Sequence, residues 1–371
     1  MSLAEVQLEA DRKRLGRSPA LLRRKWLRMT ASPFAFLRGA SALWAEALRL
    51  EPALLRGIPG TGTLVGDLHL ENIGTFRTAR GVALHVNDFD ETFVGPWSFD
   101  VARLLTSTLL ARSELGCTGL EVIELAAQVL EGHSLGVAGA NARLPTTLVN
   151  TVHEAAVKPD DKFLSKRLEA PERLVRDEKT PQAPAWCVPM VKRAIEVWSE
   201  VTKQREPVSL VDLTRRIAGT GSLGVERLMA LVKVGDVTRL LELKEVRGSS
   251  FHDAQLSAAH LIEAWAKCLP RPPLELAAAA LGAIPVVVRP LFASDEKLAV
   301  KDFDRAALPQ TLRAIGVMAG EVHRRGAKTM GKWNAEHRDV LMQRAAHLAG
   351  LHEQAFVGFC RGVHGQFGDL R

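Results

Sequence analysis

The residues with the clearest chemical potential form two short polar segments. Residues 66–72 read GDLHLEN, and residues 86–90 read VNDFD. Carboxylate and amide oxygens are hard ligands of the kind that magnesium prefers, and magnesium usually takes only one or two protein carboxylates together with substrate phosphates. A further carboxylate is then free to accept a proton from a substrate hydroxyl. Asp67, Asn72 and Asp88 therefore predict a phosphoryl-transfer site.

The flanking sequence predicts how these residues are positioned. The runs TLV at 63–65 and VALHV at 82–86 each predict a strand that leads to a polar segment, and a hairpin would bring Asp88 back beside Asn72. Residues 92–97 predict a loop, followed by a helix over 101–112. Asp100 would either complement the start of that helix or brace the loop at Asp67 by accepting backbone N–H groups.

A second motif lies much later in the chain. Residues 219–224 read GTGSLG, and such glycines let backbone amides approach phosphates closely. Alone, the motif is weak evidence and fits a dinucleotide-binding fold as well. Residues 231–246, with a Gly-Asp turn, favour a hairpin that carries Lys244 on its second strand. A lysine on a strand after a glycine loop is the phosphate-gripping arrangement of kinases, and the alternative is a solvent-facing strand residue.

The remaining elements are predicted from apolar periodicity. A helix over 255–268 carries Glu263, which would either pair with Lys244 or be an exposed acid. His323, near a helix end, is expected to complement the helix dipole. Arg38 sits in an apolar stretch and would either snorkel or point at an anionic site. Further helices are predicted over 3–16, 19–30, 34–50, 121–135, 188–203, 312–324 and 333–360, a buried strand over 284–291, and an irregular excursion near a site mouth over 144–187.

Composition bounds the class of protein. A chain of 371 residues with 47% hydrophobic and 25% charged residues is globular, and it is long enough for two domains or one bilobed unit. The four cysteines form no CxxC pair, which supports neither a zinc site nor a disulfide framework and favours a reducing compartment. The start of the sequence lacks a signal-peptide pattern, and its longest apolar run, 276–288, contains Pro285. We therefore expect a cytoplasmic protein with no membrane partner.

The net charge of +7 is concentrated near the start of the chain. Residues 1–28 carry eight Lys or Arg against three acidic residues. Such a patch can bind nucleic acid or another acidic partner. The placement of aromatic residues in this segment does not suit base stacking, so a solvated helix face is the favoured interpretation and nucleic acid is an unlikely partner.

The two polar segments, GDLHxxN and DFD, resemble the catalytic loop and metal-binding turn of aminoglycoside phosphotransferases and the wider protein-kinase-like superfamily. SPFAFLRG at 32–39, NDFDET at 87–92 and GPW at 95–97 resemble a bacterial family known as domain of unknown function 2252, over most of the chain. The kinase-like resemblance implies binding of ATP and magnesium. It implies a catalytic role for Asp67, magnesium binding by Asn72 and Asp88, and support of the catalytic loop by Asp100. It also implies nucleotide binding by Gly219, Thr220, Gly221, Ser222, Gly224 and Lys244, with Glu263 as the helix partner of the lysine.

The sequence departs from the kinase pattern in three ways. Val65 stands where a histidine usually leads the catalytic loop, and the metal turn reads Asp-Phe-Asp rather than Asp-Phe-Gly. The catalytic loop also precedes the glycine loop, which a circular permutation explains, because residues 314–326 resemble the helix that normally enters the catalytic loop. The implied fold is α+β, bilobed, kinase-like and circularly permuted. It would comprise a large helical lobe over 1–204, a small β-rich nucleotide-binding lobe over 205–300, and a helical return over 301–371. Residues 219–224 would lie over Asp88.

The sequence thus predicts an ATP- and magnesium-dependent phosphotransferase that acts on a hydroxyl of an unknown small molecule or protein. Two alternatives keep the nucleotide: a binding regulator without turnover, and a nucleotidyl transferase that moves AMP. A metallophosphoesterase built on Asp67 and His69 would need further ligands in motifs such as G-N-H, which the sequence lacks.

Overall fold

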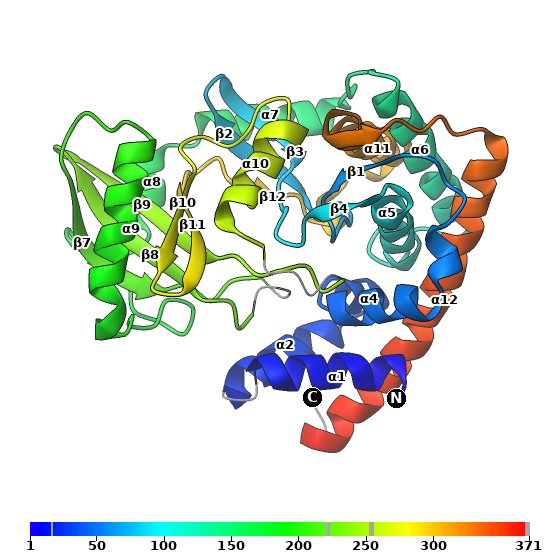
Figure 1. Cartoon of the computed structure of the whole chain (residues 1–371), viewed down its shortest axis with the longest axis horizontal. Coiled ribbons are helices and arrows are strands. Elements are labelled where there is room, and N and C mark those ends of the chain that lie inside the picture. The colour runs from blue at the N-terminus through cyan, green and yellow to red at the C-terminus, as the bar shows by residue number, and fades with distance from the viewer. Residues whose placement is uncertain (16–17, 220, 222, 252–255, 368–371) are drawn as a thin grey trace.

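The computed structural model describes residues 1–15, 18–219, 221, 223–251 and 256–367. The protein is a mixed α+β structure in which about half of the residues are helical and the sheets are small and antiparallel. The largest sheet lies at one side of the molecule and most long helices at the other (Figure 1). The expected α+β class is therefore confirmed.

The largest sheet has the strand order β10-β11-β9-β8-β7. Its strands are β7 (Val208–Arg215), β8 (Arg227–Val234), β9 (Val237–Glu245), β10 (Ala277–Leu281) and β11 (Ile284–Pro290). The predicted hairpin over 231–246 is confirmed by β8 and β9, which turn at Gly235 with φ +56°. One face packs on helix α9 (Val188–Val201), which precedes the domain boundary expected at residue 204. Helix α10 (Ala258–Cys268) contacts β10, β11 and α11 (Leu308–Gly326), and so lies between this sheet and the helices.

Two smaller sheets carry the polar segments. Strand β2 (Ile73–Thr78) pairs with β3 (Gly81–Val86) and with β12 (Glu296–Lys297), and β1 (Thr61–Leu64) pairs with β4 (Phe93–Pro96) and β13 (Ala327–Thr329). The strands predicted over 63–65 and 82–86 overlap β1 and β3, and Asp88 does return beside Asn72. The hairpin partner of β3 is β2, however, which was not predicted, and β1 lies in the other sheet. The loop predicted over 92–97 is wrong because β4 forms a strand there. Its Gly95 and Pro96 are typical turn residues, and only its pairing with β1 makes it extended.

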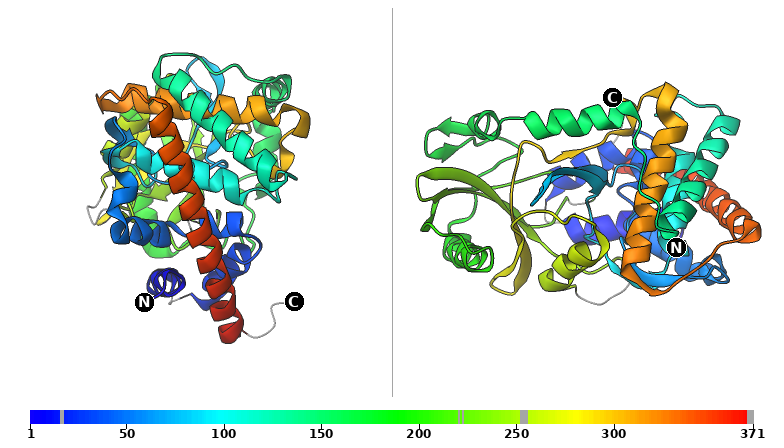
Figure 2. Two further views of the ribbon diagram at one scale, coloured as in Figure 1. Left: turned by 90° about the vertical axis from the view of Figure 1, so that its right-hand side faces the viewer. Right: turned by 90° about the horizontal axis from the view of Figure 1, so that it is seen from above.

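The long helices brace these sheets from behind. Helices α6 (Gly119–Val137) and α11 run side by side (Figure 2), and their backbones touch at four glycines. A Cβ atom at Gly132, Gly136, Gly316 or Gly320 would lie 2.1–2.2 Å from a carbonyl oxygen of the opposite helix. Only glycine fits at such an approach. Helix α5 (Ser98–Leu110) packs between α6 and the last helix, α12 (Ala335–Phe367).

The N-terminal helices are α1 (Leu3–Leu15), α2 (Pro19–Met29), α3 (Pro33–Leu37) and α4 (Ser41–Leu50). Helix α1 packs on α12, so the N-terminal helices lie beside the end of the last helix (Figure 1). The predicted single helix over 34–50 is wrong, because residues 38–40 are not helical and separate α3 from α4. There Gly39 lies so close to Met29 that a Cβ atom would be 2.6 Å from its Sδ. Short 3-10 turns follow at η1 (Pro52–Leu55), η3 (Val300–Asp302) and η4 (Arg305–Ala307).

The segment 144–187 is more regular than its sequence predicts. It contains α7 (Thr146–Val157), α8 (Asp160–Ser165), the small hairpin β5 (Leu168–Ala170) and β6 (Arg173–Leu174), and the turn η2 (Ala185–Cys187). Helix α7 buries only Leu148 and Ala155, so it has no apolar stripe from which to predict it.

Two predictions about the whole chain can be compared with the structure. In the described ranges, every helix is too short or too polar to cross a bilayer. Cys117, Cys187, Cys268 and Cys360 are all free thiols.

Candidate active site

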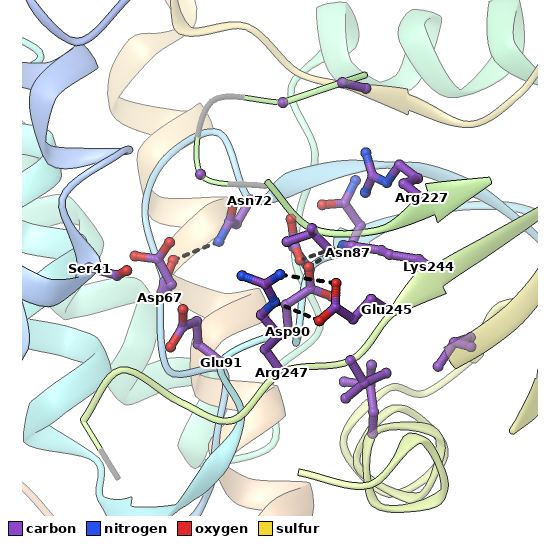
Figure 3. A pocket seen from close by; sticks show the side chains of 18 of the residues that line it. Ser41, Asp67, Asn72, Asn87, Asp90, Glu91, Arg227, Lys244, Glu245 and Arg247 are labelled. Carbon is purple, nitrogen blue, oxygen red and sulfur yellow. Dashed lines mark hydrogen bonds and ion pairs between the residues drawn. The ribbon is translucent and has the colours of Figure 1, made fainter. Parts of the chain in front are cut away.

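A cavity of about 350 Å³ lies where the five-stranded sheet, the two polar segments and the N-terminal helices meet (Figure 3). Its lining includes six residues that the sequence singles out: Asp67, Asn72, Asp88, Gly219, Gly221 and Lys244. Thr220 and Ser222 lie outside the described residues. The remaining two predicted residues lie outside the lining. Gly224 packs on Leu15, and Glu263 is exposed on α10.

The loop that carries Asp67 is fixed by its backbone. Gly66 has φ +88°, and a Cβ atom there would lie 1.9 Å from the carbonyl oxygen of Glu91. The N–H groups of Val65 and Gly66 donate to the two carboxylate oxygens of Asp100, at 2.7 and 2.9 Å. Asp100 is fully buried. The bracing role predicted for Asp100 is therefore confirmed, although the residue also sits in the first turn of α5.

Asp100 is itself held by a buried histidine pair. His323 Nε2 lies 3.1 Å from an Asp100 oxygen, and His323 Nδ1 lies 2.8 Å from Nε2 of His133. Trp97 stacks on His323, and Trp333 stacks on His133. Burial holds the pKa of His133 well below its usual value, so this ring is neutral. The dipole role expected for His323 in the last turn of α11 stays a prediction, and the structure adds a contact of its buried ring with Asp100.

The carboxylate of Asp67 is paired with Arg103, which lies on α5. Arg103 Nε donates to Asp67 Oδ1 at 2.5 Å, and a second nitrogen of this fully buried guanidinium donates to the carbonyl of Leu37 at 2.9 Å. Burial raises the pKa of Asp67, and Arg103 opposes the shift without cancelling it. A carboxylate with a raised pKa is a better proton acceptor than a free aspartate, so Asp67 has the environment of a general base.

The two predicted metal ligands face the same cavity. Asn72 donates its amide N–H to the carbonyl of Asp67 at 2.6 Å, which leaves the amide oxygen as its free coordinating atom. The N–H of Asn87 donates to the carbonyl of Asn72 at 3.0 Å, so the hairpin places Asp88 next to Asn72. Burial would raise the pKa of Asp88. Lys244 and Lys297 outweigh that effect and hold the pKa well below its usual value, so the carboxylate is ionised.

These donors fit a magnesium ion that has few protein ligands. Within the described part of the chain, no cluster of three His, Cys, Asp or Glu side chains is placed to hold a metal. Asn72 and Asp88 supply hard oxygen atoms. The buried Asn87 Oδ1, on a residue that lines the cavity, has no hydrogen-bond partner among the residues that the structure describes. Magnesium commonly completes such a site with water and substrate phosphates.

Lys244 reaches the metal turn from the sheet. Its ammonium forms an ion pair with Asp90 and lies 3.8 Å from Asp88 Oδ1. The alternative of a solvent-facing lysine is thus excluded, because its side chain is only 15% exposed. The pairing considered for Glu263 is wrong: the α10 face that carries this acid points to solvent, whereas Lys244 faces residues 88–90.

Sequence reasoning missed two acids that follow Asp88. Burial raises the pKa of Asp90, and the nearby Asp88 adds to the effect. Burial and then Asp67 raise the pKa of Glu91 to about 7, although its carboxylate accepts hydrogen bonds from the backbone and hydroxyl of Ser250. The available signal was their place in NDFDET, directly beside the predicted ligand.

The basic N-terminal helices also contribute to the cavity. Arg14 and Arg38 line it, and Arg38 pairs with Glu71 at 2.7 Å. Arg28 donates to the carbonyl of Gly219 at 3.1 Å, which ties α2 to the glycine loop. The expectation of a solvated basic face over 1–28 is therefore wrong for Arg14 and Arg28, and the anionic-site alternative for Arg38 remains a prediction.

The family model described as "Uncharacterized protein conserved in bacteria (DUF2252)" matches residues 17–179 and 150–361. Together these matches span most of the chain, so the protein belongs to this family. No curated protein and no solved structure matches the chain.

Proposed function

We propose that this member of the DUF2252 family is an ATP- and magnesium-dependent phosphotransferase with a kinase-like, circularly permuted fold. One observation carries the proposal. Gly219, Gly221 and Lys244 line the same cavity as Asp67, Asn72 and Asp88, although the two groups lie far apart in the sequence. Patterns that only resemble a kinase site have no reason to converge, whereas parts of one site must do so.

The arrangement of the sheet supports the same proposal. The glycine loop joins β7 to β8, Lys244 lies on the third strand, β9, and α10 follows that strand. Kinases use this sequence of parts, with a glycine-rich loop over the phosphates, a lysine on the third strand and then a helix. Helix α11 contacts β1, the strand that leads into the Asp67 loop. In an unpermuted kinase-like chain such a helix would lead directly into the catalytic loop. A circular permutation cuts the covalent connection between α11 and β1 but keeps their contact in space.

The roles of the residues follow from their positions. Lys244 and the glycine loop would hold the triphosphate, and Asn72 and Asp88 would hold magnesium. Magnesium, when bound, would neutralise charge on the phosphate oxygens. Asp67 would accept the proton of the acceptor hydroxyl. The hydroxyl oxygen would form a bond to the γ-phosphorus, while the bond from the γ-phosphorus to the oxygen that bridges it to the β-phosphate breaks. ADP would be the leaving group.

Calorimetric titration with ATP, with and without magnesium, tests the nucleotide part of the proposal. We expect magnesium-dependent binding that weakens in Lys244→Ala, because the variant loses a charged contact to phosphate. Lys233→Ala is the matched control, since Lys233 lies on the neighbouring strand and pairs with Glu172 at the surface. Absence of ATP binding by the native chain would reduce the glycine loop to a turn and contradict the proposal.

A second variant tests the chemistry separately. Asp67→Asn keeps an oxygen for Arg103 but lowers basicity, so ATP binding should persist while ATP turnover falls about 100-fold or more. Turnover is measured as ADP release, and AMP release would instead favour nucleotidyl transfer. Unchanged turnover in this variant would remove Asp67 from the proposed role.

A further inference from the structure

The wall of the cavity formed by the five-stranded sheet carries a cluster of charge that no part of the proposed mechanism uses. Residues that pair directly across an antiparallel sheet point to the same face. Arg227, Lys244 and Val287 form one such row, and Met229, Glu242 and Arg289 form the next. Glu242 therefore lies on the same face as Lys244, one row further from the edge at which the glycine loop begins.

Glu242 is fully buried and collects three guanidinium groups. Arg216 donates to Glu242 Oε1 at 2.5 Å, Arg289 Nε donates to Oε2 at 3.1 Å, and Arg289 Nη2 forms an ion pair with the same oxygen at 3.0 Å. Arg227 Nε lies 3.3 Å from Oε1 without making a hydrogen bond. All three arginines line the cavity. We call Arg216, Arg227 and Arg289 around Glu242 the arginine cluster.

The arginine cluster has more positive than negative charge. Glu242 neutralises one of the three guanidinium charges, and Asp295, 3.7 Å from Arg289, offsets a second. The nearby Asp88 and Asp90 do not neutralise the remainder, because Lys244 and Lys297 already pair with them. A largely buried cation such as Arg227, whose side chain is 12% exposed, is costly without a full counter-charge in the absence of a ligand. Planar guanidinium groups with free N–H donors match phosphate oxygens in geometry.

We infer that the arginine cluster is an anion-binding site that takes a phosphate or diphosphate group. Glu242 fixes the three side chains from beneath, so that their remaining donors are directed into the cavity before the ligand arrives. The inference depends on the proposed function only for the source of the group. The group is either part of the nucleotide itself or part of an acceptor that already carries a phosphate.

Calorimetric titration of the full-length chain with sodium pyrophosphate tests the inference. We expect binding to the native chain that weakens about 10-fold to 100-fold in Arg216→Gln and in Arg289→Gln, because each variant loses a charge-assisted contact. Arg215→Gln is the matched control. Arg215 neighbours Arg216, pairs with Glu226 and does not line the cavity, so pyrophosphate affinity should be unchanged.

The source of the phosphate group is decided by competition. If the group belongs to the nucleotide, pyrophosphate competes with a non-hydrolysable ATP analogue, and Arg216→Gln weakens the analogue as well. If it belongs to the acceptor, pyrophosphate binds to the chain saturated with the analogue, and Arg216→Gln leaves the affinity for the analogue unchanged. Binding of pyrophosphate by a chain that does not bind ATP would contradict the proposed function while supporting the anion site.

Two results would overturn the inference. One is absence of pyrophosphate binding by the native chain, and the other is native-like affinity in both glutamine variants. Within the described ranges Arg216 makes a single ion pair, and its side chain is 30% exposed, so Arg216→Gln should fold even if Arg289→Gln does not. Arg216→Lys, which keeps the charge, should retain most of the affinity that Arg216→Gln loses.

Discussion

Asp100 and Glu242 are both fully buried carboxylates, and the contrast between them distinguishes the two walls of the cavity. Asp100 accepts two backbone N–H groups and contacts His323, so it fixes the shape of the loop that carries Asp67. Glu242 is surrounded by three arginine side chains, so it fixes the position of charge. On the wall formed by the Asp67 loop, the buried carboxylate of Asp100 determines backbone geometry. On the wall formed by the five-stranded sheet, the buried carboxylate of Glu242 holds arginine side chains toward the cavity.

The largest expected effect comes from removing the charge of Glu242. Glu242→Gln leaves three guanidinium groups without their main counter-charge, and we expect a loss of about 3–5 kcal/mol in the free energy of unfolding. Pyrophosphate should restore a large part of this loss, because an anion in the cavity replaces the missing carboxylate charge. Urea unfolding with and without pyrophosphate measures both. A loss that pyrophosphate leaves unchanged would contradict the distinction between the walls.

The corresponding change on the other wall should behave differently. Asp100→Asn places an amide N–H group against backbone N–H groups that need an acceptor, and we expect a loss of about 2–3 kcal/mol. Pyrophosphate should not restore this loss, because the unsatisfied groups lie behind the loop rather than in the cavity. Urea unfolding under the two conditions above provides the comparison.

The helix crossing behind the Asp67 loop offers a third test. Gly316→Ala would put a Cβ atom 2.2 Å from the carbonyl oxygen of Val129, and we expect a loss of about 1–3 kcal/mol as α6 and α11 separate. Gly350→Ala is the control in another long helix, where a Cβ atom meets no atom of the described residues within 4 Å. That variant should gain up to about 1 kcal/mol from helix propensity. Thermal unfolding of both variants measures these changes. Equal stability of the two variants would contradict the claim that the close contact of α6 and α11 requires glycine.

The smallest expected effect is the pH dependence contributed by Glu91. Burial and Asp67 raise the pKa of Glu91 to about 7 in the folded chain. Its contribution to stability is therefore fully present below about pH 4.5, and is lost as pH rises through about 7. Between pH 5 and pH 8, Glu91→Gln should show a shallower fall in unfolding free energy than the native chain, by about 1–2 kcal/mol. Parallel pH profiles of the two proteins would exclude this role.

Several parts of the structure could be predicted because their signals are local. Strand β3 follows from the apolar run at 82–86, and a hairpin that sets Asp88 beside Asn72 was expected, but its partner strand, β2, was not predicted. The β8–β9 hairpin follows from the Gly-Asp turn at 235 and 236. Bracing by Asp100 was among the alternatives, since an acid at a helix start has few local roles. Elements with weak local signals, such as β4 and α7, could not be predicted.

Other features depend on which surfaces meet, and no local pattern encodes that. Glu242 stands two residues before Lys244 on an alternating strand, so its face could have been predicted, but its three arginine partners come from other parts of the chain. Lys244 meets Asp90 rather than Glu263 because of how the sheet is set against the hairpin. His323 reaches Asp100 only because α11 packs against the strand that leads into the Asp67 loop.

The sequence by itself determined the chemical groups of this protein and the hairpins that carry them, because residue type and turn chemistry act over a few positions. The tertiary structure decided that Asp67 and Lys244 share one cavity and that the arginine cluster faces it. Packing of the sheet, the hairpin and the N-terminal helices sets those distances. The energy of that packing comes from contacts between residues that are distant in sequence.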